Sequence, residues 1–112
     1  MDAAHLYSDL LAQLNETLLR MTSPEWDAAS HLGTVEERRR ALRQMLAIQQ
    51  LRLALGNAVL LGITEKLKAN ESDLENGRKS VREALTSLDH FGRVLDTIAN
   101  FIAIAGRIVP LL

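Results

Sequence analysis

The chain has 112 residues, of which 47% are hydrophobic and 4% aromatic, and its formal net charge is -1. This charge gives no general attraction to nucleic acid or acidic lipid. The absence of cysteine excludes disulfides, thiol catalysis and thiolate metal sites. Two prolines and six glycines leave little material for turns. We therefore expect a single all-α domain over residues 1–112.

Two helices are predicted in the first third of the chain. The first spans about residues 3–21, because leucines recur there at spacings of three and four, which is typical of an amphipathic helix. The second spans about residues 24–30. Ser23 is a good N-cap, proline suits the first helical position, and Gly33 is a stop signal.

Two long helices are predicted after this point. Thr34 and Glu37 have the spacing of a capping box, so a helix over about 35–69 should begin there. A last helix over about 71–109 should end before Pro110, because proline disfavours helical geometry in the residue before it.

An apolar repeat of seven residues crosses the boundary between the two long helices, which indicates a coiled-coil-like seam. Its members are Leu53, Leu60, Leu67, Leu74, Val81, Leu88, Leu95, Ile102 and Val109. The expected fold is a long antiparallel helical hairpin with an added N-terminal helix, forming a coiled-coil-like bundle that a second chain completes. The hairpin could turn near Asn70 or near Gly77, and the sequence leaves both open.

The C-terminal stretch from Thr97 to Leu112 is almost wholly apolar. A turn near residue 70 would place residues 98–112 opposite the charged residues 29–43, which cannot cover them. We therefore predict a homo-oligomer, with a two-fold dimer favoured and Arg107 at the edge of its interface. The predicted interface residues are Leu53, Leu60, Leu95, Ile98, Phe101, Ile102, Ala105, Ile108 and Val109.

One basic cluster has two interpretations. Arg38, Arg39, Arg40 and Arg43 could contact nucleic-acid phosphates, but no aromatic residue is interleaved and two glutamates adjoin them. Residues 1–33 carry a surplus of acids that could neutralise these arginines, so pairing within the chain, or with a second chain, is the favoured interpretation.

No constellation indicates catalysis, a metal or a cofactor. His5, His31 and His90 lack metal-ligand spacing, and the spacing of Asp27 and His31 is that of an ordinary helix-surface ion pair. Glycines inside the predicted helices have no preceding strand, so they form no phosphate-binding loop, and close helix packing is the favoured explanation. These are Gly56, Gly62, Gly92 and Gly106.

The leading functional hypothesis is a small non-enzymatic helical protein that acts through protein–protein interaction and self-association. The N-terminus lacks the pattern of a secretory signal, and no run of eighteen apolar residues is present, so a cytoplasmic protein is expected. The first alternative is a membrane-interacting helical protein, such as a pore-former or a holin-like protein. The second is a nucleic-acid-associated regulator that uses Arg38–Arg43, and we expect nucleic acid to be the less favoured partner.

Overall fold

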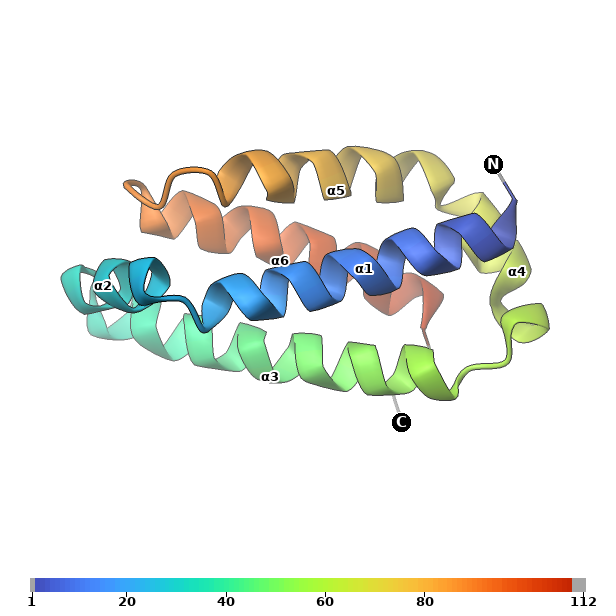
Figure 1. Ribbon diagram of the computed structural model, residues 1–112, viewed down its shortest axis with the longest axis horizontal. Coiled ribbons are helices and arrows are strands. Elements are labelled where there is room, and N and C mark those ends of the chain that lie inside the picture. Colours follow the sequence, from blue (N-terminus) through green and yellow to red (C-terminus); the bar gives the residue numbers. More distant parts are fainter. Residues whose placement is uncertain (1, 110–112) are drawn as a thin grey trace.

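A computed structural model describes residues 2–109, and these residues form an all-α structure of six helices (Figure 1). The helices are α1 (Ala3–Met21), α2 (Pro24–Leu32), α3 (Val35–Asn57), α4 (Leu60–Ala69), α5 (Glu71–Ala84) and α6 (Phe91–Ile108). The prediction of an all-helical fold is confirmed for the described residues.

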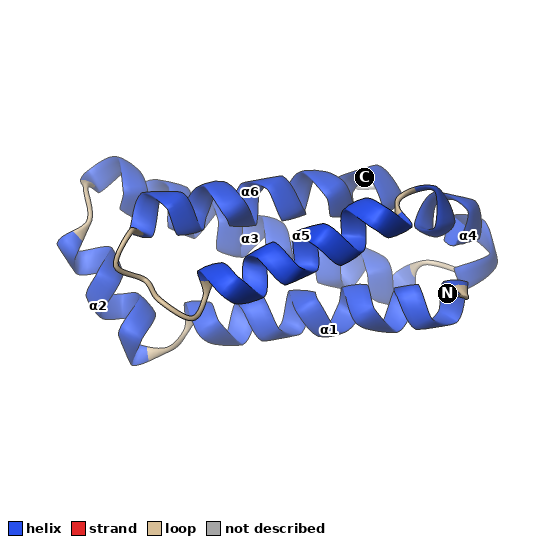
Figure 2. Ribbon diagram, turned by 90° about the horizontal axis from the view of Figure 1, so that it is seen from above, coloured by secondary structure: helices blue, strands red, loops and turns tan. Residues whose placement is uncertain are grey.

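Four longer helices form a bundle-like globule whose longest extent is 43 Å. Around the bundle, α1 packs against α3, α3 against α6, α6 against α5, and α5 against α1. The two short helices close the ends: α2 lies at one end and α4 at the other (Figures 1 and 2). Helices α3 and α6 run in the same direction, whereas α1 and α5 run in the opposite direction.

The helix starts follow the local sequence. The side chains of Asp2, Ser23 and Thr34 accept hydrogen bonds from backbone N–H groups in the first turns of α1, α2 and α3. At α3, Glu37 also accepts from the backbone N–H of Thr34 at 2.8 Å, so the predicted capping box is present. These caps satisfy donors that a helix cannot pair internally.

The predicted helix over 35–69 is wrong as a continuous element, because α3 ends at Asn57 and α4 begins at Leu60. Gly56 and Asn57 both have low helix propensity, which weakens the helix where it stops. Tyr7 of α1 donates a hydrogen bond of 2.8 Å from its hydroxyl to the Leu55 carbonyl at this end. The break lets α4 turn away from α3 and pack against α1.

The predicted helix over 71–109 is also divided, since α5 ends at Ala84 and α6 begins at Phe91. The Thr86 hydroxyl donates to the Glu83 carbonyl at 2.6 Å, which satisfies an acceptor at the end of α5. A break near Asn70 is present between α4 and α5, and Gly77 lies inside α5. The chain therefore turns several times where one long hairpin was predicted.

These extra turns change what the C-terminal helix faces. Gln44 of α3 donates to the Leu95 carbonyl of α6 at 2.8 Å, and the two helices run in parallel from there. The end of α6 consequently lies beside the apolar end of α3 and beside α4, and not opposite residues 29–43. The expectation that this chain cannot cover its own apolar tail is wrong for the described residues up to 109.

Close packing explains only some of the glycines. Among residues 2–109, a β-carbon added at Gly56, Gly62 or Gly106 would have no neighbour within 4 Å. At Gly77 it would lie 3.0 Å from Cδ1 of Ile104 and 3.3 Å from Cδ1 of Phe101. The close approach of α5 to α6 therefore depends on Gly77, a glycine outside the predicted set. Within that set, a β-carbon at Gly92 would lie 2.9 Å from Oε2 of Glu37, and close packing is the wrong explanation for the three open glycines.

Candidate interaction surface

Most of the predicted interface residues lie in the core of this chain. Leu95, Ile98, Phe101, Ala105, Ile108 and Val109 are buried, and Ile102 and Leu60 are half-buried against them. Arg107 is exposed and pairs with Asp73 of α5 at 2.9 Å. Up to Val109 the tail is covered by its own chain, so the apolar character of that part is no longer an argument for a second chain; residues 110–112 lie outside the described residues.

Leu53 is the exception, and it belongs to a different surface. It is 63% exposed on α3, and the same helix exposes Leu46 by 56%, Leu42 by 67% and Val35 by 55%. The residues that α3 buries are Ala41, Gln44, Ile48, Leu51 and Leu55. With 3.6 residues per turn, the exposed residues fall on the side of α3 opposite to these. We call Val35, Leu42, Leu46 and Leu53 the α3 stripe.

Further exposed apolar residues flank the two ends of the α3 stripe. Leu32, at the end of α2, is 90% exposed. Val59, in the break between α3 and α4, is 72% exposed, and Leu61, at the start of α4, is 87% exposed. Among the described residues, one large exposed hydrophobic residue lies outside residues 32–61. It is Leu19 of α1, which lies near Arg82 of α5 and near Leu85, the residue after α5. Exposed apolar residues are therefore concentrated in residues 32–61, most of them on the outer side of α3, and such concentration is typical of an interaction site.

The basic cluster is mostly engaged within the chain. Arg38 donates to the Gly33 carbonyl at 2.8 Å, Arg40 pairs with Asp96 of α6 at 2.7 Å, and Arg43 pairs with Glu36 at 2.9 Å. Arg39 is exposed and has no ion pair among the described residues. It lies on the outer side of α3, between Val35 and Leu42.

The acids of α1 pair with α5 rather than with the basic segment 34–70, so the predicted charge pairing is wrong for them. Asp9 lies 3.4 Å from Arg78, and Glu16 lies 3.8 Å from Arg82. Arg78 and Arg82 are one helical turn apart on α5, and their partners are two turns apart on α1. These two ion pairs connect α1 to α5.

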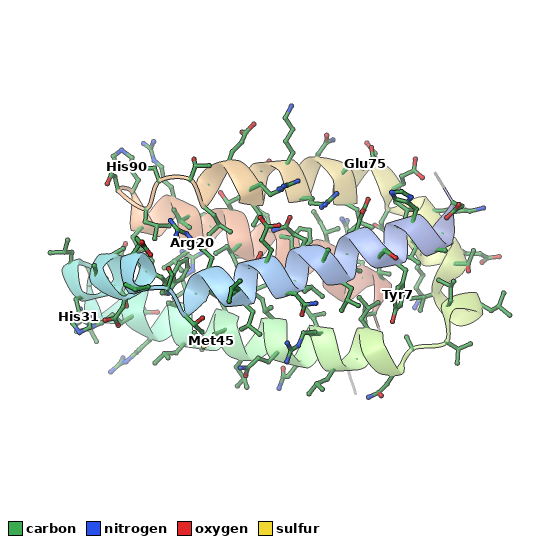
Figure 3. The ribbon with its side chains drawn as sticks, viewed as in Figure 1. Tyr7, Arg20, His31, Met45, Glu75 and His90 are labelled. Carbon is green, nitrogen blue, oxygen red and sulfur yellow. The ribbon has the colours of Figure 1, made fainter. Side chains whose placement is uncertain are left out.

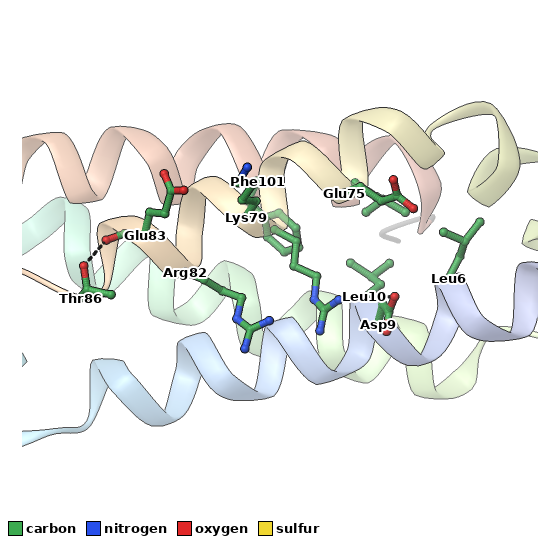
Figure 4. Close-up of a pocket in the computed structure, with 11 residues that line it drawn as sticks. Leu6, Asp9, Leu10, Glu75, Lys79, Arg82, Glu83, Thr86 and Phe101 are labelled. Carbon is green, nitrogen blue, oxygen red and sulfur yellow. Dashed lines mark hydrogen bonds and ion pairs between the residues drawn. The ribbon is translucent and has the colours of Figure 1, made fainter. Parts of the chain in front are cut away.

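A cavity of about 530 Å³ lies between α1 and α5 (Figure 4). Leu6 and Leu10 of α1, Leu74 of α5 and Phe101 of α6 provide its apolar lining. Its charged lining is balanced, with the bases Arg78, Lys79 and Arg82 and the acids Asp9, Glu75 and Glu83. The cavity can accept an apolar group, but its charges do not select a ligand of either sign.

Groups that could carry chemistry are dispersed. His31 lies at the α2 end of the molecule and His90 lies in the loop before α6 (Figure 3), while His5 is on α1. Within the described part of the chain, no group of three or more His, Asp or Glu residues could hold a metal ion. Of the described helices, none is long and apolar enough to cross a membrane.

Comparison with models of protein families, with curated proteins and with solved structures finds no match for this chain. The described structure thus defines a class by its architecture: an all-α, bundle-like globule with one apolar outer face.

Proposed function

We propose that this chain is a non-enzymatic helical protein that acts by binding protein, and that it associates with a second copy of itself through the outer face of α3. The observation that supports this proposal is the α3 stripe, which leaves four aliphatic side chains in water on one helix face. A helix on the surface of a globule normally has a polar outer face. The stripe departs from that rule along most of the length of α3.

The magnitude of the burial suits a reversible dimer. Complete burial of a large aliphatic side chain contributes about 1.5–3 kcal/mol, and the stripe residues are 55–67% exposed. Each would then contribute about 1–2 kcal/mol, and eight of them meet in a symmetric pair. The sum is similar to the roughly 4–15 kcal/mol that association costs. Further burial at Leu32, Val59 or Leu61 would favour the dimer.

Charge favours a protein partner over lipid or nucleic acid. Arg43 beside the stripe is neutralised by Glu36, and Arg38 and Arg40 are held by groups of the same chain. Arg39 is then the one member of the basic cluster without a hydrogen-bond or ion-pair partner among residues 2–109. A surface that attracts phosphates or anionic headgroups needs several available cations.

The test is the molar mass in solution over a wide concentration range, by sedimentation equilibrium from about 1 µM to 1 mM, which spans dimer free energies of about 4–8 kcal/mol. The wild-type chain should shift from monomer to dimer within this range. Leu46→Lys should weaken the dimer at least about tenfold, because it removes apolar contact and places two ammonium groups at the interface.

Leu19→Lys is the matched control, because Leu19 is also exposed, by 74% against 56% for Leu46, but lies on the α1–α5 side. It should leave the dimer constant unchanged. A wild-type chain that stays monomeric at the highest concentration would overturn the proposal. Binding of that monomer to neutral or anionic vesicles in a flotation assay would assign the α3 stripe to a membrane surface instead.

A further inference from the structure

We infer that the second copy docks with its α3 antiparallel to the first, about a two-fold axis at the level of Gln44. This inference rests on the proposed self-association and adds its geometry. It pairs Leu42 with Leu46 of the second copy, and Val35 with Leu53 of the second copy. Each pair occurs twice because the axis exchanges the two chains.

The spacing of the α3 stripe residues determines the register, that is, which residues of the two α3 helices meet. Val35, Leu42, Leu46 and Leu53 are separated by seven, four and seven residues, so the pattern reads the same in both directions. Its centre is residue 44, with members two and nine positions away on each side. In an antiparallel pair of helices centred there, every apolar member meets another apolar member. These spacings also match the alternation of three and four residues in coiled-coil packing.

The neighbouring positions agree with this register. Arg39 falls opposite Gln49 of the second copy, whose amide oxygen can accept a hydrogen bond from the guanidinium group. Both side chains are exposed in the single chain, so they are available for this contact.

Arg39 decides against the parallel arrangement. A parallel pair would also match the four apolar positions with their own copies. It would, however, place Arg39 beside Arg39 of the second copy at the interface, with no ion-pair partner in the described chain for either. Like charges that lose water without a counter-charge are strongly unfavourable. The antiparallel arrangement instead holds the two arginines about ten residues, or roughly 15 Å, apart along the helix axis.

Single cysteines can test the orientation cleanly, because the chain has no cysteine of its own. Val35→Cys chains and Leu53→Cys chains carrying different mass tags are mixed at a protein concentration above the dimer dissociation constant and oxidised mildly. Val35 and its symmetry copy would be about 27 Å apart in the antiparallel dimer, at 1.5 Å per residue over 18 residues. A disulfide needs Cα atoms within about 7 Å.

The expected product is the mixed disulfide between a Val35→Cys chain and a Leu53→Cys chain. It should exceed the disulfide homodimer of either variant at least tenfold. Dominant Val35→Cys or Leu53→Cys homodimers would show a parallel arrangement and overturn the inference. The molar mass of the wild-type chain in solution, measured without oxidant, distinguishes failure of the antiparallel register from failure of self-association. If the wild-type chain is a dimer and no cross-link forms, the register is wrong but self-association stands. If it is a monomer, both proposals fail.

Arg39→Leu provides a second measurement on the same pair of cysteine variants. Without the two guanidinium groups, the parallel arrangement no longer brings like charges together. The disulfide homodimers of each cysteine variant should therefore rise several-fold relative to the mixed disulfide. Lys79→Leu on the exposed side of α5 is the control, and it should leave the ratio unchanged. An unchanged ratio with Arg39→Leu would overturn the role of Arg39 in fixing the orientation.

Discussion

Replacing single helical glycines by alanine tests the packing between α5 and α6. Gly106 of α6 is exposed and would gain a β-carbon with no neighbour within 4 Å, whereas Gly77 of α5 would place it 3.0 Å from Ile104. Both residues lie inside helices, so both substitutions remove the same backbone entropy from the unfolded chain. Their difference isolates the contact between the helices.

The helix-propensity gain from glycine to alanine is about 1 kcal/mol in a helix interior. Gly106→Ala should show most of this gain, and the midpoint of thermal unfolding should rise by about 4 °C. At Gly77 the methyl group must displace the side chains of Ile104 and Phe101, and crowding in a packed region costs about 1–3 kcal/mol. Gly77→Ala should therefore be unchanged or less stable than wild type.

Urea unfolding followed by circular dichroism measures both free energies, at a concentration below the dimer constant so that association does not contribute. Gly62→Ala in α4 is a further control, because it also has no neighbour within 4 Å. Equal stabilisation by the substitutions at Gly77 and Gly106 would refute the reasoning, since the described distance between α5 and α6 would then impose no restriction on side-chain size.

Two further substitutions test polar groups of the fold. Gln13 is completely buried and its Oε1 has no hydrogen-bond partner in the described part of the chain, while its Nε2 donates to Thr17 at 3.1 Å. Gln13→Leu should stabilise the fold by about 1 kcal/mol, because an unsatisfied buried acceptor costs more than one neutral hydrogen bond contributes; a loss of stability in urea unfolding would contradict this. Thr34→Ala should cost about 1 kcal/mol through loss of the cap of α3, whereas Thr34→Ser should retain it; equal loss in both variants would show that the hydroxyl is not responsible.

The sequence predicts those parts of the fold that depend on neighbouring residues. The bounds of α1 and the starts of α2 and α3 agree with the structure because leucine periodicity, N-caps and the capping box act within one or two helical turns. The breaks after Asn57 and Ala84 were not predicted, because the apolar repeat of seven continues across both. Gly56 and Asn57 before one break, and Thr86 and Asp89 within the other, were local signals that the periodicity outweighed.

Those two missed breaks also account for the error in the predicted interface. A continuous hairpin fixes which residues face each other, so the tail was set opposite charged residues. The turn between α5 and α6 instead brings Leu95 beside Gln44, with the apolar ends of α3 and α6 together. Tertiary pairing of this kind depends on where the chain reverses. An error in the position of one turn therefore changes which helix face is left exposed, and with it the predicted interaction surface.

Helix α3 is apolar on two opposite sides, and this feature links its sequence to its proposed role. One side, with Ile48, Leu51 and Leu55, is fully covered by α1 and α6. A helix that only covered a bundle would carry polar residues on the other side. The leucines there add nothing to the folded single chain and increase its exposed apolar surface. They are explained if α3 serves two cores, one inside its own chain and one shared with a second copy.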